Sequence, residues 1–261
     1  GLALTGKLAA PTRFARLIRS LRTAAEPGVD TRIAFTAPND SPPASPQAPR
    51  LGYTDQEQAE RGEALLVSTG LTKGFAPLVV ILGHGSRNQN NPHASAYNCG
   101  ACSGRFSGPN ARLVCAMANR PAVRALLAGR GIEIPDGTWF VGGEHDTCND
   151  QIEWYDTLDV PPRSGATLEG IREALDRACR LHAQERCRRF ASAPPGMDPE
   201  AAHRHVAARA QDISQVRPEL GHATNACAFF GRRSPSRGAF FDRRAFLISY
   251  DPTQDPDGAI L

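Results

Sequence analysis

No apolar run in this sequence of 261 residues is long enough to cross a membrane, because a spanning helix needs about 18 to 20 consecutive apolar residues. The sequence also lacks a glycine-rich phosphate loop of either common type and any internal repeat. The usual sequence evidence for a nucleotide-binding or solenoid protein is therefore missing. Hydrophobic residues make up 41% of the chain and charged residues 22%, which indicates one sizeable globular domain.

Strong charge of one sign is missing as well. The formal net charge is +3 and the arginines are spread along the chain, so nothing favours nucleic-acid binding. No secretory signal precedes the seven cysteines, and their odd number favours thiol or metal chemistry in a reduced compartment over a disulfide framework. The missing initiator methionine and the abrupt end DPDGAIL predict a fragment of a larger cytoplasmic protein.

Hydrophobic periodicity predicts an α/β fold with a mostly parallel sheet flanked by helices. The run LVVIL (78–82) is apolar on both pleat faces, as expected of a central parallel strand covered on both sides. Further strands are predicted in RIAFTAP, GTWFVGGEHDT and RAFLISYDPTQD. A capping box at Thr54 and Glu57 predicts a helix that ends near Gly70. Other helices are predicted over 110–131 (as two segments, the second with Pro121 in its first turn), 166–192 and 199–213.

Composition divides the chain into three parts. Residues 1–38 hold a basic amphipathic helix and a short strand, residues 39–50 form a proline-rich surface loop, and residues 51–261 form the main α/β domain. The arginines of the first helix fit either a solvated face or a contact with a membrane or partner.

A histidine follows the predicted buried strand directly. His84 lies between Gly83 and Gly85, and the chemistry of open α/β sheets collects beyond the carboxyl ends of strands. Cys99 comes fifteen residues later in NCGACSGR. Because imidazole nitrogen and thiolate sulfur are ligands that zinc prefers, His84 and Cys99 are the predicted metal ligands.

Two ligands do not complete a zinc site, which needs four, or three and a water. The spacing of Cys99 and Cys102 is that of a zinc knuckle, but no second CxxC follows, so a self-contained zinc finger is not expected. The candidates to complete the site are Cys102, His145, Asp146 and Cys148. The remaining cysteines are predicted to be packing residues: Cys115, Cys179, Cys187 and Cys227.

Several longer stretches resemble one family. They are PLVVILGHGSRNQNNPHASAYNCGACSGR, GIEIPDGTWFVGGEHDT, VRPELGHATNACAFF and RAFLISYDPTQDPDG. In order and spacing they are similar to the C-terminal part of the DabA family, the zinc-binding subunit of the Dab inorganic carbon transporter. The likeness runs from about residue 55 to the last residue.

The resemblance implies a site and a core like those of β-carbonic anhydrases. By position, His84 and Cys99 match two of the family's zinc ligands. The other two belong to a CxDxR segment that is absent from this chain and would lie upstream of Gly1. Half of a zinc site would remain here, and the isolated fragment is expected to be inactive.

In the intact family member, the resemblance implies that zinc-activated water hydrates CO2 to bicarbonate in one direction, as part of a CO2-concentrating mechanism. The implied partner is DabB, a membrane subunit that translocates ions and is similar to subunits of respiratory complex I. The protein would then be peripheral, on the cytoplasmic side of the cell inner membrane. Arg105 fits either a role in positioning an anion or a surface ion pair.

Two other functions stay open. The first is a stand-alone zinc hydrolase that uses His84, Cys99 and either His145 or Asp146. The second is a non-catalytic docking module, in which the basic first helix and helix 166–192 bind the membrane partner and the metal is structural.

Overall fold

A computed structural model describes residues 32–89, 104–219, 225–242 and 244–258, with scattered positions between 5 and 17. Cys99, Cys102 and most of the predicted basic helix lie outside the described residues. Within the described helices none is long and apolar enough to span a membrane.

The main sheet has three strands in the order β1-β2-β3. Strand β1 (Leu78–Gly85) runs parallel to β2 (Trp139–Asp146), and β2 pairs with β3 (Gln151–Trp154) in the antiparallel direction. The α/β class is confirmed, but this sheet is mixed, and in the described part of the chain β1 lies at its edge and not at its centre. The sheet is mixed because a tight turn precedes β3. In this turn Asp150 adopts the left-handed conformation (φ 55°), and the chain returns antiparallel to β2.

One face of this sheet packs against three helices, α3 (Asp55–Ser68), α4 (Gly108–Ala118) and α5 (Pro121–Ala128). The predicted capping box is present, since Thr54 accepts a hydrogen bond from the Glu57 N–H and Glu57 accepts one from the Thr54 N–H. The break between α4 and α5 falls where predicted, because Pro121 fits the first turn of a new helix. Val79 and Phe140 contribute the strand side chains of this core.

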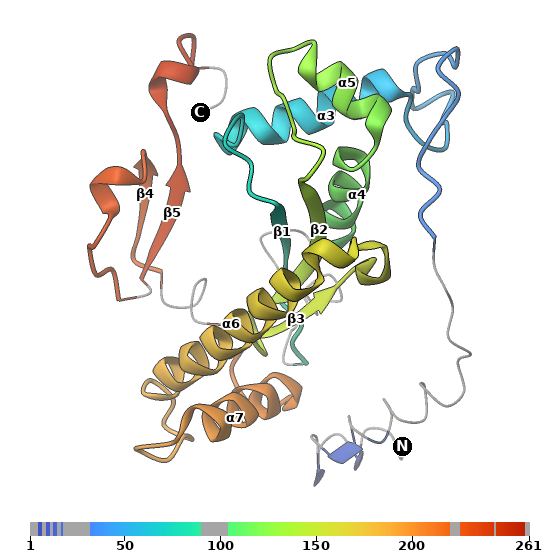
Figure 1. Cartoon of the computed structure of the whole chain (residues 1–261). Helices are drawn as coiled ribbons and strands as arrows, with labels where there is room; N and C mark the ends of the chain where they lie inside the picture. Colours follow the sequence, from blue (N-terminus) through green and yellow to red (C-terminus); the bar gives the residue numbers. More distant parts are fainter. Residues whose placement is uncertain are drawn as a thin grey trace.

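The long helix α6 (Pro162–Cys187) crosses the opposite face of the sheet (Figure 1). Its Leu168 packs against Leu78 and Val141, which alternate with the side chains of the first core. Helix α7 (Pro199–Gln211) lies along α6 and buries Val206 against it. The sheet is thus covered on both faces, as its apolar strands require.

A second, two-stranded parallel sheet is formed by β4 (Cys227–Gly231) and β5 (Ala245–Ser249). It lies apart from the main sheet in Figure 1. Three short 3-10 helices complete the described elements, over Thr157–Asp159, Ser234–Ser236 and Pro252–Gln254. The predicted strand in RAFLISYDPTQD therefore belongs to this second sheet and does not join the ends of β1 and β2.

The segment before α3 has less regular structure than predicted. In residues 32–38, where a strand was expected, the described pairing is one bridge between Thr36 and Tyr53. The proline-rich loop that follows is attached to α3, because Asn39 donates to the Asp55 carboxylate (3.1 Å) and accepts from the Asp55 N–H (2.9 Å).

Candidate functional site

The carboxyl ends of β1 and β2 bring two histidines together. His84 and His145 are register partners in the parallel pair, so both side chains leave the sheet on the face covered by α6. Asp146 is the next residue along β2 and belongs to the opposite face, with the register partner Gly85. Of the two predicted alternatives for a third ligand, His145 is therefore on the same face as His84 and Asp146 is not.

Two hydrogen bonds with Ser107 fix the backbone of His84. The His84 N–H donates to the Ser107 hydroxyl at 2.5 Å, and the Ser107 N–H donates to the His84 carbonyl at 2.8 Å. A Cβ atom at Gly83 would lie 2.4 Å from the Ser107 carbonyl group, so only glycine permits this approach. Ser107 thus lies beside His84, although the two residues are 23 positions apart in the sequence.

A buried carboxylate lies on the α4 face of the same strand ends. The Glu144 side chain is fully buried, and its Oε1 accepts a hydrogen bond from Arg87 at 2.5 Å. Its Oε2 has no hydrogen-bond partner among the described residues. Gly85 leaves room for this side chain, because a Cβ there would lie 2.5 Å from Oε1.

Asp146 and Cys148, two of the candidates to complete the zinc site, are built into the turn after β2. The Asp146 Oδ1 accepts from the backbone N–H groups of Arg87 (3.1 Å) and Cys148 (3.0 Å). The Cys148 Sγ lies 3.2 Å from the Ser86 hydroxyl, and burial raises the pKa of this thiol to about 12.

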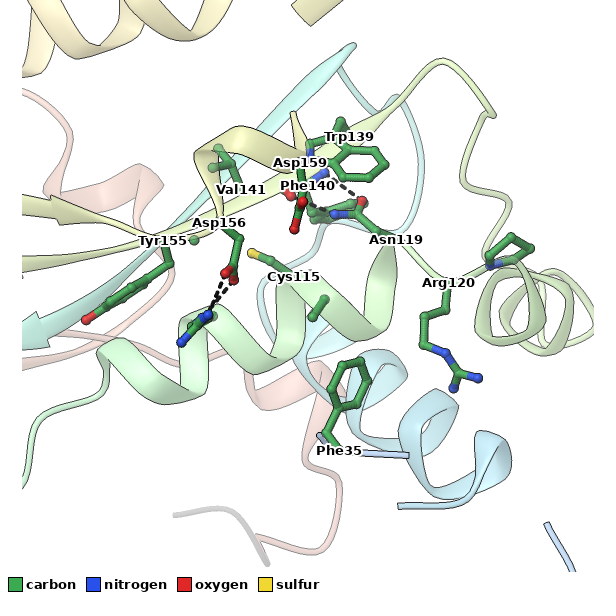
Figure 2. Close-up of a pocket in the computed structure, with 14 residues that line it drawn as sticks. Phe35, Cys115, Asn119, Arg120, Trp139, Phe140, Val141, Tyr155, Asp156 and Asp159 are labelled. Carbon is green, nitrogen blue, oxygen red and sulfur yellow. Dashed lines mark hydrogen bonds and ion pairs between the residues drawn. The ribbon is translucent and has the colours of Figure 1, made fainter. Parts of the chain in front are cut away.

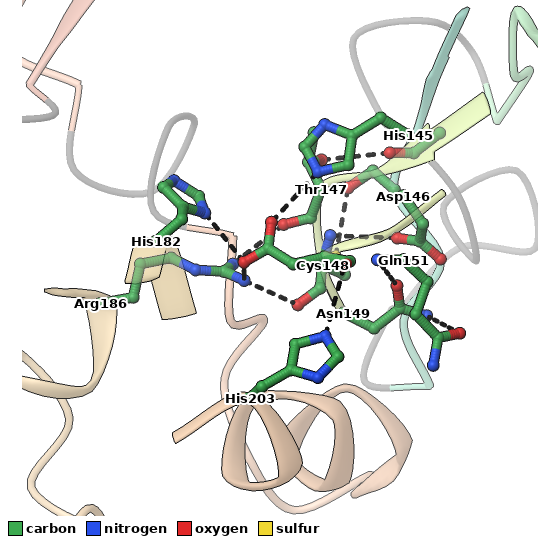
Figure 3. A network of polar contacts seen from close by, with 12 residues as sticks. His145, Asp146, Thr147, Cys148, Asn149, Gln151, His182, Arg186 and His203 are labelled. Atoms are coloured by element: carbon green, nitrogen blue, oxygen red, sulfur yellow. Dashed lines mark hydrogen bonds and ion pairs between the residues drawn. The ribbon is translucent and has the colours of Figure 1, made fainter. Parts of the chain in front are cut away.

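A polar network links His145, His182 and Arg186 (Figure 3), and the carboxylate of Asp150 is its centre. This fully buried carboxylate contacts His145 (3.1 Å), His182 (2.8 Å) and Arg186. His203 of α7 lies 3.2 Å from the backbone carbonyl of Asp150. Burial alone would raise the pKa of Asp150, but the hydrogen bonds from both histidines and the charge of Arg186 bring it below its ordinary value.

The same network contains a group of side chains able to hold a metal ion. One ligand atom each from His145, Asp150 and Cys179 lies within 4.8 Å of the others. Hydrogen bonds with Asp150 and then Cys179 raise the pKa of His145 to about 9. Cys179 is buried, as predicted, and it also contacts the His145 ring. The spacing in the sequence could have indicated this polar contact, because Cys179, His182 and Arg186 are three and four residues apart and therefore lie on one face of α6.

The other sequence-predicted residues have simpler surroundings. Cys115 and Cys187 are buried, as predicted, whereas Cys227 is exposed on β4 and does not pack in a core. Arg105 is exposed, and its role in positioning an anion stays a prediction. The pairing of His84 with Cys99 also stays a prediction, because Cys99 lies outside the described residues.

A cavity of about 500 Å³ lies at the other end of the sheet, and Figure 2 shows the residues that line it. It is lined by the first half of β2, by Phe35 and by α4. Arg112 closes one side through two hydrogen bonds to Asp156 (2.5 and 2.7 Å). The cavity lies away from the strand ends that carry His84 and His145.

These features define a mixed α/β protein with imidazole, carboxylate and thiol groups at the carboxyl ends of a parallel strand pair. The whole chain, residues 1–261, matches the family described as "Probable inorganic carbon transporter subunit DabA". This chain belongs to the DabA family.

Similar proteins of the same description occur in several bacteria. The chain is 57% identical to one from Methylococcus capsulatus over 260 residues, which cover 100% of this chain and 24% of that protein. It is 58% identical over 251 residues to one from Dechloromonas aromatica, covering 96% of this chain and 25% of that protein. No solved structure matches.

The chain thus spans about a quarter of the length of these relatives. Its predicted placement in the C-terminal part of the family, and the likeness to a β-carbonic anhydrase core, stay predictions.

Proposed function

We propose that this chain is part of the zinc-binding subunit of an energy-coupled inorganic carbon transporter, which hydrates CO2 to bicarbonate for accumulation in the cytoplasm. The relatives from Methylococcus capsulatus and Dechloromonas aromatica are described as probable inorganic carbon transporter subunits. The observation that carries the proposal is the position of His84 at the carboxyl end of β1, with its backbone held by Ser107.

The residues present fit a zinc ion. His84 offers an imidazole nitrogen beside glycines that admit a ligand closely, and the thiol of Cys99 follows fifteen residues later in the sequence. When bound, zinc supplies the Lewis acidity that activates water at neutral pH. The remaining ligands would come from a CxDxR segment that this sequence does not contain.

The chain's own residues would shape the surroundings of this site. The charged pair of Arg87 and Glu144 lies beside the strand ends, with Glu144 fully buried. The buried Glu144 carboxylate fixes the direction of the Arg87 guanidinium, and a guanidinium binds small oxyanions well. Because Glu144 belongs to the sheet face opposite His84, we assign this ion pair a structural role at the strand ends and no contact with the zinc ion.

A membrane subunit of the DabB type is the proposed partner, and its ion flux would drive hydration in one direction. The protein would then be a peripheral subunit on the cytoplasmic face of the inner membrane. The description of the relatives as a subunit supports a partner.

A stand-alone zinc hydrolase is the second candidate function. It is favoured by the register pairing of His84 with His145, which places both imidazoles on one face of the sheet.

The two functions are separated by uptake of labelled inorganic carbon into cells that produce the full-length subunit with or without its membrane partner. The transporter proposal predicts uptake only with both proteins, and loss of uptake in His84→Ala. Uptake unchanged in His84→Ala would overturn it. A hydrolase would instead act on its substrate without the membrane partner and would lose that activity in His145→Ala.

A further inference from the structure

We propose that His145, Asp150 and Cys179 form a second metal site, which binds a zinc-type divalent cation and is independent of the site proposed at His84 and Cys99. The three residues come from β2, from the turn before β3 and from α6. A cation bound there would tie the β2–β3 hairpin to the helix that covers it.

The distances suit such an ion. Ligand atoms at about 2.0 to 2.3 Å from a tetrahedral zinc ion lie roughly 3.3 to 3.7 Å from one another. The His145 Nε2 is 3.1 Å from the Asp150 Oδ1, and the three ligand atoms all lie within 4.8 Å. Only small side-chain adjustments would therefore place all three at bonding distance.

The second oxygen of Asp150 is already held. His182 contacts Oδ2 at 2.8 Å and Arg186 donates to the same oxygen, while His145 contacts Oδ1. Partners that hold one carboxylate oxygen orient the other toward a metal, as outer-shell groups do in known metal sites. Arg186 is nearly fully buried and donates also to the carbonyl groups of Thr147 and Pro218, both at 2.9 Å, so this support is rigid.

The charges of the ligands suit a divalent cation. One thiolate and one carboxylate would offset its charge, and Arg186, which keeps its bond to Oδ2, would leave the group with a net charge of +1. Binding would release the thiol proton of Cys179 and any proton on the His145 ring to solvent. A nitrogen, oxygen and sulfur donor set favours zinc and similar transition metals over magnesium or calcium, which take oxygen ligands.

The fourth coordination position has space beside it. Asp150 and Cys179 both line a cavity of about 470 Å³, together with Ile152, Trp154 and His203. Water or a small ligand can reach a cation from this side. If this group were only a structural network of ion pairs, it would need the partners of Asp150. It would not need a thiol beside His145, whereas a metal site would use one.

Cobalt binding to the 261-residue chain tests the site, because cobalt bound by thiolate gives a charge-transfer absorption band in the near ultraviolet. We expect Cys179→Ser to lose the band of this site and to weaken Co²⁺ binding by at least about 100-fold, since even outer-shell losses cost 10- to 100-fold. Cys99→Ser should keep that band. The matched control is Cys227→Ser, at an exposed cysteine outside the cluster, which should leave both readouts unchanged.

A second variant covers the case in which Cys179→Ser does not fold. His145→Gln keeps a polar side chain of similar reach, and circular dichroism reports whether each variant is folded. A folded His145→Gln protein should bind Co²⁺ as weakly as Cys179→Ser. Unchanged affinity in either folded variant would overturn the proposal. Disappearance of every thiolate band in Cys99→Ser would do the same, while leaving the proposed function standing.

Discussion

His84 of β1 and His145 of β2 lie side by side as register partners in the parallel strand pair. The pairing places two imidazoles on one face of the sheet at the carboxyl ends of its strands. Each has a separate set of contacts, because Ser107 fixes the backbone of His84 while Asp150 and Cys179 engage the ring of His145. Two neighbouring histidines can therefore serve two different sites.

Replacement of Arg186 by methionine should strongly destabilise the protein. The guanidinium is the charged partner of the fully buried Asp150 carboxylate, and removing one member of a buried ion pair costs about 3 to 5 kcal/mol. The free energy of unfolding in urea measures the effect. The control is Arg204→Ala, at a solvent-exposed arginine 3.2 Å from Glu200, which should cost less than about 1 kcal/mol. Equal effects of both substitutions would refute the assigned role of Arg186.

A methyl group at Gly83 should disrupt the anchoring of His84. Since the new Cβ would lie 2.4 Å from the Ser107 carbonyl group, the backbone must move, at a cost of about 1 to 3 kcal/mol. Gly170→Ala is the matched control, because Gly170 lies on the solvent-exposed side of α6 and has open space around it. It should stabilise the helix by up to about 1 kcal/mol. Thermal unfolding of both variants should shift in opposite directions, and a neutral Gly83→Ala would contradict the prediction.

The contact between the proline-rich loop and α3 should weaken in acid. Hydrogen bonds from Asn39 and then Arg120 lower the pKa of Asp55 below its ordinary value of 3.8. A carboxyl group with a lowered pKa in the folded state stabilises the protein above its unfolded pKa and loses this contribution as the pH falls through the folded value.

Urea unfolding of the wild type and of Asp55→Asn, measured from neutral pH down to pH about 3, tests this dependence. The difference between the two proteins should be largest at neutral pH and should shrink below pH about 4. A difference that stays constant over this range would show that the charge of Asp55 contributes nothing.

Much of the fold was readable from the sequence. The capping box located α3, Pro121 located the start of α5, and the apolar run after Pro77 located β1. Strand β3 was missed because its four residues, QIEW, are too short to show a period. The antiparallel return depends on the left-handed backbone of Asp150, which side-chain patterns do not reveal.

The candidate sites were predictable to different degrees. His84 was chosen as a candidate ligand because a histidine between glycines follows a buried strand, and its role as a ligand stays a prediction. The His145, Asp150 and Cys179 group joins residues from distant elements, so spacing alone could not assemble it. Only the helical spacing of Cys179, His182 and Arg186 indicated that α6 has a polar face toward the β2–β3 hairpin.

The most direct test of the central claim is the zinc content of a full-length family subunit that carries this sequence, measured in a Cys179→Ser background so that the second site is silent. The account predicts that His84→Ala and Cys99→Ser each abolish the remaining zinc while the protein stays folded. Zinc content equal to that of the background protein in both variants would contradict the claim that the imidazole and the thiolate hold one ion.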